Sequence, residues 1–268
     1  MSIKAIVNAD DFGYSKMVSD AILECLRKQF ISQTTLMVNM PFAKEAVEAV
    51  KREGFADRVG LHLNLGEGKP LTRKITECPK FCDDSGCFNG VFRRKRYSSF
   101  WFSTTKKERI ALREEICAQF EEYMGYGLSL KHLDGHYHHH LPMPIFCVAA
   151  KMMRKFDFNS YRKPYSMSWF EQRALELKTS SAFTKLFTLG QSLRTVDYFG
   201  SVADYRRYCH HFPNAATIEI MVHPQFDVNG RLIDKDAREG VDCDEMAQIK
   251  GMLVSDDADL VSYKECFA

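Results

Sequence analysis

Two adjacent carboxylates, Asp10 and Asp11, follow the apolar run at 3–7 and precede Gly13. A short β-branched run that ends in acidic residues and a glycine is typical of a strand that finishes in a turn. Neighbouring side chains of an extended chain point in different directions, so the two carboxylates suit two roles, a metal ligand and a general base. The simpler alternative is that the pair only caps the following helix and lies in solvent.

Histidines stand at the ends of other predicted strands. His62 lies in the second half of the predicted strand at 58–65, a cluster of histidines occupies 132–140, and His223 follows the apolar strand at 216–222. Each one alone is more simply explained as a surface residue or a satisfied core residue. In a parallel barrel, however, the C-terminal ends of distant strands meet at one mouth. One carboxylate and two imidazoles, such as Asp11, His62 and a histidine of the cluster, form a common open metal site.

The cluster HLDGHYHHH offers several candidate ligands. Positions 132, 134 and 136 share one face while the chain stays extended. His136 is nearest the C-terminal rim and is our preferred metal ligand, whereas His132 and Asp134 lie one layer deeper and are expected to support the ligands. Of the three histidines that follow, we expect His138 to line the pocket and the others to lie on the rim.

This arrangement predicts hydrolysis by a metal-activated water. A bound metal lowers the pKa of its water, to about 7 for zinc, so a modest base such as Asp10 suffices to take the proton. His223, from across the barrel, would donate a proton to the leaving group.

The elements that must position these residues alternate along the chain, which favours parallel βαβ units. Closure into a (β/α) barrel, TIM-like and possibly seven-stranded, is the expected α/β fold, formed by one domain over 1–268. Predicted strands cover 3–7, 34–39, 58–65, 130–133, 159–162, 195–199, 216–222 and 259–263. Predicted helices cover 15–29, 43–52, 104–123, 144–156, 168–190, 202–211 and 242–254.

The alternation pauses between 66 and 103, a stretch with Pro, Gly, Cys, aromatic residues and a basic cluster at 93–96. Such a long connection inside a compact domain is usually functional. We interpret it as a loop insertion over the barrel mouth. The basic cluster is equally well explained as a solvated loop.

Composition narrows the class of protein. The chain has 268 residues, 45% hydrophobic and 27% charged, with a net charge of +2. This is ordinary for a soluble globular protein and offers no basic stripe for nucleic acid. The first residues are too polar for a signal peptide, and no run of about 18 apolar residues occurs. We therefore expect a cytoplasmic protein without a nucleic-acid or membrane partner.

The nine cysteines are scattered and odd in number, which argues against a disulfide framework. Cys78, Cys82 and Cys87 lie close together, but their spacing lacks a CxxC step and a following partner. Free thiols are expected here, and a structural zinc is the less favoured alternative.

Four motifs together identify a family. NADDFG near the start, GLHLNLGEGKPL at 60–71, HLDGHYHHH at 132–140 and the strand ending in His223-Pro224 resemble the YdjC-like carbohydrate deacetylases, which include the chitooligosaccharide (diacetylchitobiose) deacetylases. The resemblance spans essentially the whole chain. It implies a barrel of the glycoside hydrolase/deacetylase superfamily.

Carried over position by position, the resemblance implies a metal site of Asp11, His62 and His136, usually with magnesium. On ligand chemistry alone, zinc or another transition ion suits two imidazoles and a carboxylate better. The resemblance also implies Asp10 as the base and His223 as the acid. A homodimer is compatible with the family.

Arg162, in YRKP, occupies a place where the family tends to have an arginine before a proline, and is expected to orient Asp10 or bind substrate. The family commonly has Cys-His-Pro at the seventh strand, where this chain has Val222-His223-Pro224. The segments 97–105 and 167–192 match no named pattern. The choice of sugar and its chain length are therefore open.

Three functions compete. The first is hydrolysis of an N-acetyl group from an amino sugar or a short chitin-type oligosaccharide, with Trp101, Phe100 and Trp169 as sugar-stacking or simply packing aromatics. The second is another metal-dependent hydrolase on the same barrel, such as a phosphoesterase. Only the basic cluster at 93–96 favours it. The third is a non-catalytic binding protein, which loss of a site residue would favour, yet all are present. We rank them in that order.

Overall fold

The computed structural model describes residues 2–91, 102–164, 166–167, 193–236 and 246–267. The predicted helix at 168–190, the basic cluster at 93–96 and the aromatics Phe100, Trp101 and Trp169 lie outside the described residues. Nearly all remaining predicted strands and helices are present, with shifted ends.

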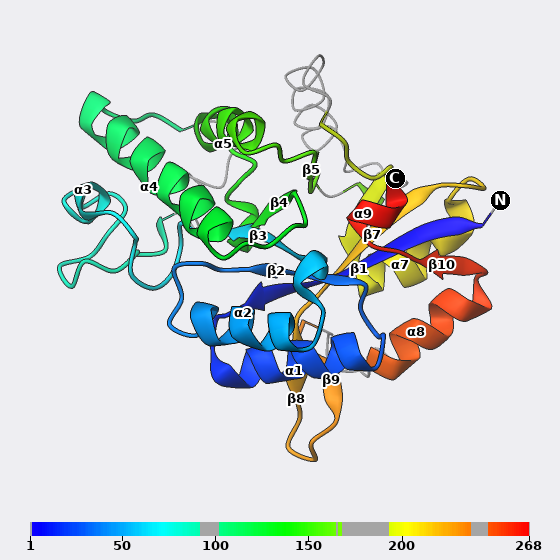
Figure 1. Cartoon of the computed structure of the whole chain (residues 1–268). Coiled ribbons are helices and arrows are strands. Elements are labelled where there is room, and N and C mark those ends of the chain that lie inside the picture. The colour runs from blue at the N-terminus through cyan, green and yellow to red at the C-terminus, as the bar shows by residue number, and fades with distance from the viewer. Residues whose placement is uncertain (1, 92–101, 165, 168–192, 237–245, 268) are drawn as a thin grey trace.

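A curled parallel sheet forms the centre of the molecule (Figure 1). Its strand order is β5-β4-β3-β2-β1-β7-β6, and β10 pairs with the first residues of β1. The strands are β1 (Ile3–Phe12), β2 (Gln33–Leu36), β3 (Val59–Leu63), β4 (His132–Gly135), β5 (Ser160–Tyr161), β6 (Tyr198–Ser201), β7 (Thr217–Val222) and β10 (Ala258–Leu260). All of β2, β3 and β4 is buried, as expected for parallel strands covered on both faces.

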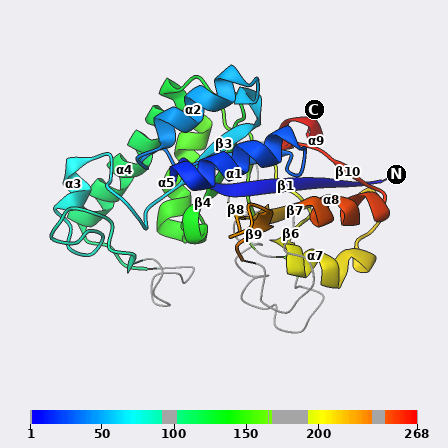
Figure 2. The same ribbon diagram turned by 90° about the horizontal axis from the view of Figure 1, so that it is seen from below.

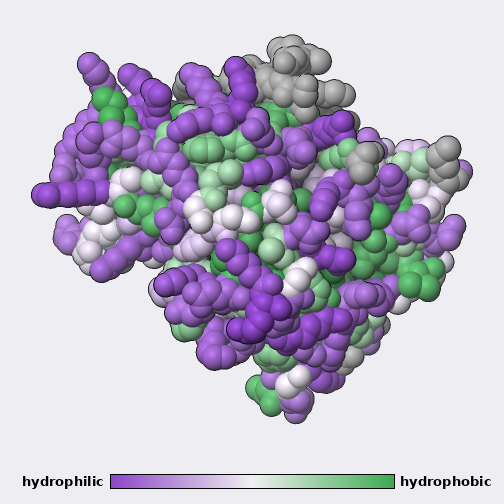
Figure 3. All heavy atoms as spheres, viewed as in Figure 1, coloured by the Kyte–Doolittle hydropathy of each residue, from purple (hydrophilic) through white to green (hydrophobic). Residues whose placement is uncertain are grey.

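The helices flank this sheet. In Figure 1, α1 and α2 lie on one side and α4 and α5 on the other, and Figure 2 shows the same layers from below. They are α1 (Lys16–Arg27), α2 (Ala43–Arg52), α3 (Arg73–Thr76), α4 (Lys106–Gly125), α5 (Met143–Lys155), α7 (Val202–Tyr208), α8 (Met246–Ser255) and α9 (Tyr263–Cys266). Short 3-10 turns cover Ala56–Arg58, His136–His138 and Cys209–His211. Polar side chains cover most of the face seen in Figure 3, and smaller apolar patches lie between them.

Local sequence explains where the helices begin. Ser15 accepts a hydrogen bond from the backbone of Val18 and caps α1, as its position predicts. Thr105 and Glu108 form a reciprocal capping box at the start of α4.

The expected closed barrel is seen in part, as a half-barrel. Among the described residues, β5 and β6 are the edge strands. A bridge between Ser160 and Arg194 and a hydrogen bond of 2.9 Å from the Ser166 backbone to the Phe199 carbonyl link their neighbourhoods. Complete closure into a TIM-like barrel stays a prediction.

Two local expectations were wrong, and one element was not predicted. β1 continues to Phe12 instead of ending at Val7, so both aspartates belong to the strand. Tyr263 begins α9 and is not part of the last strand. A hairpin of β8 (Pro224–Phe226) and β9 (Leu232–Asp234), not predicted, follows β7. Each strand of the hairpin has only three residues, which is too short to show a hydrophobic periodicity.

The described part of the 66–103 insertion begins beside the strand ends and then packs on α4. The Leu71 and Thr72 backbone amides donate to the Glu115 carboxylate of α4 at 3.1 and 2.8 Å. Helix α3 also contacts α4. A covering role for residues 92–101 lies outside the described residues.

Candidate metal centre and active site

Asp11 has an unusual backbone, with φ of 68° in the left-handed region. The pairing of β1 with β2 shifts register between Ala9 and Phe12, which marks a bulge at the aspartates. Bulges re-aim side chains, and aspartate tolerates this conformation better than most residues. Asp10 and Asp11 are therefore both turned into the protein, with exposed fractions of 3% and 4%. The alternative of a solvent-exposed helix cap is wrong.

Asp11, His62 and His136 meet at the ends of β1, β3 and β4. Asp11 Oδ1 lies 2.7 Å from His136 Nδ1 and 3.4 Å from His62 Nε2. Burial raises the pKa of Asp11, but the hydrogen bond with His136 and the charges of His136 and His62 outweigh burial and hold it well below its usual value. The carboxylate is therefore ionised and can act as a ligand.

These three residues fit a metal ion. One potential ligand atom of each lies within 4.8 Å of the others. His62 Nε2 and His136 Nε2 are buried and have no hydrogen-bond partner among the described residues. A buried polar atom without a partner is costly, so a cation between these nitrogens and Asp11 would remove that cost. Two imidazoles and a carboxylate suit a transition ion at least as well as magnesium.

Asp134 fixes the orientation of His62. Asp134 Oδ1 lies 2.6 Å from His62 Nδ1, and the Thr35 hydroxyl donates to Asp134 Oδ2 at 2.9 Å. A carboxylate on the second nitrogen sets the tautomer of a metal-binding histidine and increases its basicity. Asp134 and Asp10 raise the pKa of His62 to about 10 against the opposing effect of burial. The expectation that Asp134 supports the metal ligands stays a prediction, and this contact supplies the geometry that it requires.

Arg162 lies behind the site, fully buried, and contacts three carboxylates. Its guanidinium holds Asp10 through two hydrogen bonds, lies 3.1 Å from Asp134 Oδ2 and donates to Glu219 Oε1 at 2.8 Å. Burial raises the pKa of Asp10, but the charge and hydrogen bonds of Arg162 bring it well below the usual value. Of the two expectations for Arg162, orientation of Asp10 agrees with these contacts, whereas 0% exposure leaves no surface for substrate.

Glu219, in the middle of β7, completes this cluster and was missed in the sequence. Its second oxygen accepts a hydrogen bond of 2.7 Å from the Tyr263 hydroxyl. Burial raises the pKa of Glu219 to about 7 despite Arg162. A glutamate between isoleucines in a buried strand is a signal that could have identified it, because a buried carboxylate needs a partner.

His223 faces Asp10 from the end of β7. His223 Nε2 lies 4.0 Å from Asp10 Oδ2, and His223 Nδ1 lies 2.9 Å from Asp236 Oδ2. Burial lowers the pKa of His223, but the Asp236 hydrogen bond and the charges of Asp10 and Asp11 outweigh burial and raise it above the usual value. The protonated form of the imidazole is therefore favoured.

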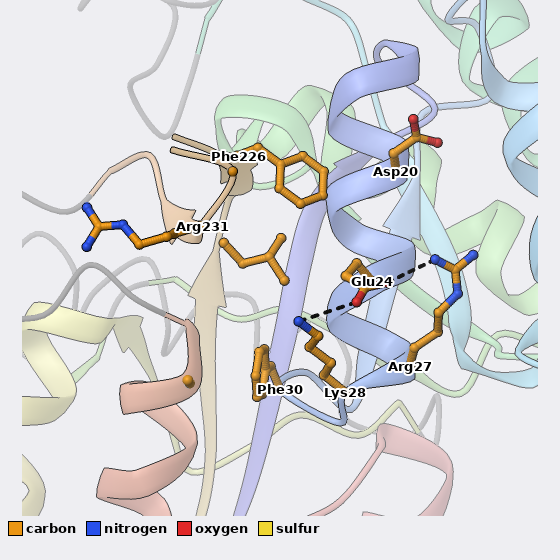
Figure 4. Close-up of a pocket in the computed structure, with 10 residues that line it drawn as sticks. Asp20, Glu24, Arg27, Lys28, Phe30, Phe226 and Arg231 are labelled. Carbon is orange, nitrogen blue, oxygen red and sulfur yellow. Dashed lines mark hydrogen bonds and ion pairs between the residues drawn. The ribbon is translucent and has the colours of Figure 1, made fainter. Parts of the chain in front are cut away.

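Asp236 lies in the turn that follows the β8–β9 hairpin, and the hairpin holds the His223 backbone through an amide hydrogen bond of 2.8 Å to Asp234 Oδ1. The hairpin packs against α1, and Figure 4 shows the Phe226 ring directed toward that helix. A hollow of about 630 Å³ lies there, and none of the candidate site residues lines it. Within it Glu24 pairs with Arg27 and Lys28, so its charges largely compensate one another.

His132 and His138, two further residues predicted for the site, contact other side chains of the protein. His132 stacks on Tyr263 with ring centroids 3.8 Å apart, and its Nδ1 lies 3.1 Å from the Ser160 hydroxyl. His138 packs edge-on against Phe199, and burial lowers its pKa to about 3, so it stays neutral. Cys78, Cys82 and Cys87 take part in no disulfide bond among the described residues.

Comparison with known proteins decides the family. The model of the YdjC-like protein family matches residues 4–251. The chain belongs to the YdjC-like family. A YdjC-like relative from Brevibacillus brevis, named carbohydrate deacetylase, is 31% identical over 229 residues, or 84% of this chain and 82% of that protein. Another from Geobacillus stearothermophilus, also named carbohydrate deacetylase, is 32% identical and covers 82% of this chain and 79% of its own length.

A solved structure shares the YdjC-like fold. It comes from Enterococcus faecalis V583, is described provisionally as a cellobiose-phosphate cleavage protein, and superposes with a TM-score of 0.71 at 22% identity over 99% of each chain. At that identity the similarity informs the fold alone. In the part of this YdjC-like chain that the structure describes, no helix combines the length and apolar character needed to cross a membrane.

Proposed function

We propose that this chain is a metal-dependent carbohydrate deacetylase that hydrolyses N-acetyl groups of amino sugars or short chitin-type oligosaccharides. The observation that carries the proposal is the meeting of Asp11, His62 and His136 next to Asp10 and His223. Relatives that are about 30% identical over most of the chain are named carbohydrate deacetylases, which supports the same reaction class.

Asp11, His62 and His136 are the proposed ligands. A divalent cation bound by them would act as a Lewis acid toward the acetyl carbonyl and would acidify a nearby water. The donor set favours zinc or another transition ion on chemical grounds, and family resemblance favours magnesium.

Asp10 and His223 are the proposed proton carriers. Asp10 is ionised and accepts the proton of the attacking water, while Arg162 fixes its position with two hydrogen bonds. Its lowered pKa makes it a weak base, so it accepts a proton efficiently only from an acidified water. His223, 4.0 Å away, protonates the departing amine as the C–N bond breaks, giving acetate and the free amino sugar.

Acetate release from diacetylchitobiose by the metal-reconstituted protein tests the proposal. Loss of the base in Asp10→Asn should lower kcat at least 10²-fold. The matched control, Asp20→Asn, removes an exposed carboxylate that pairs with Lys16 and should keep full activity. If the wild type binds metal but releases no acetate, the proposed metal centre is retained and this substrate class is rejected. Failure to bind any divalent metal would reject the centre itself.

A further inference from the structure

Tyr263, the first residue of α9, reaches the buried polar cluster behind the proposed base. The residue is only 2% exposed, and its ring stacks on His132 with centroids 3.8 Å apart. Burial and the neighbouring charge of Glu219 raise the pKa of the Tyr263 hydroxyl well above its ordinary value. The hydroxyl therefore stays protonated and acts as a hydrogen-bond donor inside the protein.

One chain of hydrogen bonds runs from the Tyr263 hydroxyl to Asp10. The hydroxyl donates to Glu219 Oε2 at 2.7 Å, and Glu219 Oε1 accepts from Arg162 Nε at 2.8 Å. The two terminal nitrogens of Arg162 donate to the two carboxylate oxygens of Asp10, at 2.6 and 2.7 Å. A planar guanidinium that is held at Nε also fixes the plane of the carboxylate that its other nitrogens bind. We call Glu219 and Arg162, both 0% exposed, the hydroxyl path.

A second chain of hydrogen bonds runs from the Tyr263 backbone toward the same carboxylate. The Tyr263 amide donates to Gln33 Oε1 of β2 at 2.8 Å. Gln33 Nε2 donates to Asn8 Oδ1 of β1 at 2.9 Å, and Asn8 Nδ2 donates to Asp10 Oδ1 at 2.7 Å. Buried polar groups that satisfy one another in a network hold each other rigidly. This second chain therefore anchors the start of α9 to the strand that carries Asp10, so the Tyr263 hydroxyl is presented in a fixed position.

The two oxygens of Asp10 have different surroundings. Oδ1 accepts from Asn8 and Arg162, whereas Oδ2 accepts from Arg162 and lies 4.0 Å from His223 Nε2. Oδ2 is therefore the oxygen directed toward the proposed acid, and it is better placed than Oδ1 to receive a proton from a water between them. A carboxylate turned out of this plane would lose hydrogen bonds at both oxygens.

We propose that Tyr263 is a positioning residue for the proposed base: through the hydroxyl path it holds the Asp10 carboxylate with Oδ2 directed toward His223. This inference deepens the proposed deacetylase function and rests on it. Tyr263 acts here only through other residues. Displacement of a catalytic group lowers kcat more than it weakens substrate binding, because that group acts in the transition state.

Tyr263→Phe tests the proposal, since it removes the hydroxyl and keeps both the ring on His132 and the backbone amide to Gln33. We expect kcat for acetate release from diacetylchitobiose to fall about tenfold, with unchanged KM and unchanged affinity for Zn²⁺. In the Asp10→Asn background the same substitution should lower the remaining activity less than about twofold, because the group that it positions is gone. Steady-state kinetics and calorimetry of the four metal-reconstituted proteins measure these values.

The matched control is Tyr205→Phe. It also removes the hydroxyl of a buried tyrosine that donates to a carboxylate, at 2.6 Å to Asp256 Oδ2, but on α7. This variant should keep the kcat of the wild type. An unchanged kcat in Tyr263→Phe overturns the proposal, as does a loss confined to KM or to metal affinity. A loss of kcat that is equally large in the Asp10→Asn background also overturns it, because Tyr263 would then act on the fold and not on the base.

Urea unfolding of the same proteins separates this proposal from the reaction itself. If the wild type releases no acetate, the deacetylase function is rejected and the unfolding data decide the role of Tyr263. Effects of Tyr263→Phe and Asp10→Asn on the free energy of unfolding that do not add, beside additive effects for Tyr205→Phe and Asp10→Asn, support a network in which Tyr263 positions Asp10. Additive effects in both pairs overturn it.

Discussion

Arg162 and Asp10 form a fully buried bidentate ion pair, with Nη1–Oδ2 and Nη2–Oδ1 distances of 2.6 and 2.7 Å. A planar guanidinium matches a carboxylate in this geometry, and lysine does not. The same guanidinium also contacts Asp134 and Glu219. One cation thus sets the position of the proposed base and balances the charge behind the proposed metal ligand His62.

Replacement of this cation should destabilise the fold. Arg162→Met leaves the carboxylates of Asp10, Asp134 and Glu219 buried without their cation, and we expect a loss of about 3–5 kcal/mol in the free energy of unfolding. Urea denaturation measures it. Adding Glu219→Gln to Arg162→Met removes one of the stranded charges and should recover part of the loss. No recovery would show that packing, and not charge, explains the defect.

The raised pKa of Glu219 predicts a specific dependence of stability on pH. Burial raises the folded-state pKa to about 7, above the ordinary value of 4.5. The folded protein then binds more protons than the unfolded chain between these values, so the contribution of Glu219 to stability falls as pH rises through that window. Glu219→Gln does not titrate there. The free energy of unfolding of the variant, relative to the wild type, should therefore increase from pH 4.5 to 7.

Denaturant curves at several pH values for both proteins check this, with Glu121→Gln, which removes a surface carboxylate of α4 that pairs with Lys155, as the control. Parallel curves for the wild type and Glu219→Gln would contradict a raised Glu219 pKa.

Asp236 should set the basic limb of the pH–rate profile. Protonated His223 is the proposed acid, so kcat/KM falls as pH rises through the His223 pKa, which Asp236 helps to raise. Asp236→Asn should shift that limb to lower pH, with an unchanged plateau once His223 is protonated. A bound cation acts on both proteins alike and does not affect this difference. Initial rates of acetate release across pH measure it, and an unshifted limb would exclude His223 as the acid held by Asp236.

Asp134 should tune metal affinity from behind His62. Asp134→Asn removes the charge 2.6 Å from His62 Nδ1, and loss of such a partner typically weakens metal binding about 10–100-fold. Calorimetry with Zn²⁺ and Mg²⁺ measures the affinity and also reports which ion the centre prefers. Cys82→Ser, at the buried thiol of the insertion, serves as a control that should bind metal normally. Equal affinities for Asp134→Asn and wild type would contradict the Asp11–His62–His136 centre.

Sequence alone predicted the meeting of Asp11, His62 and His136 because it follows from one rule. The C-terminal ends of parallel strands lie at the same edge of a sheet, and these residues are all at predicted strand ends. The α/β alternation was readable for the same reason, since helical and strand periodicities differ. The roles of these residues in catalysis stay predictions.

The residues that support the site were harder to predict from the sequence, because their roles depend on contacts between residues distant in sequence. Glu219 accepts a hydrogen bond from Arg162, which lies 57 residues away in the sequence. Asp236 reaches His223 only because an unpredicted hairpin turns the chain back. The bend at Asp11 arises from a bulge that no residue pattern announced. Pattern analysis finds the residues of a site more readily than the residues that hold them.

The hydroxyl of Tyr263 that bonds Glu219 comes from a helix after the last strand, whereas Asp10 comes from the first. During synthesis on the ribosome, the cluster around Arg162 therefore stays incomplete until α9 has emerged. A nascent chain that stops before Tyr263 has no hydroxyl to bond Glu219 and no ring to stack on His132. Domains generally fold as units during translation. The surroundings of Asp10 on the first strand are therefore completed by a helix that is made after every strand of the sheet.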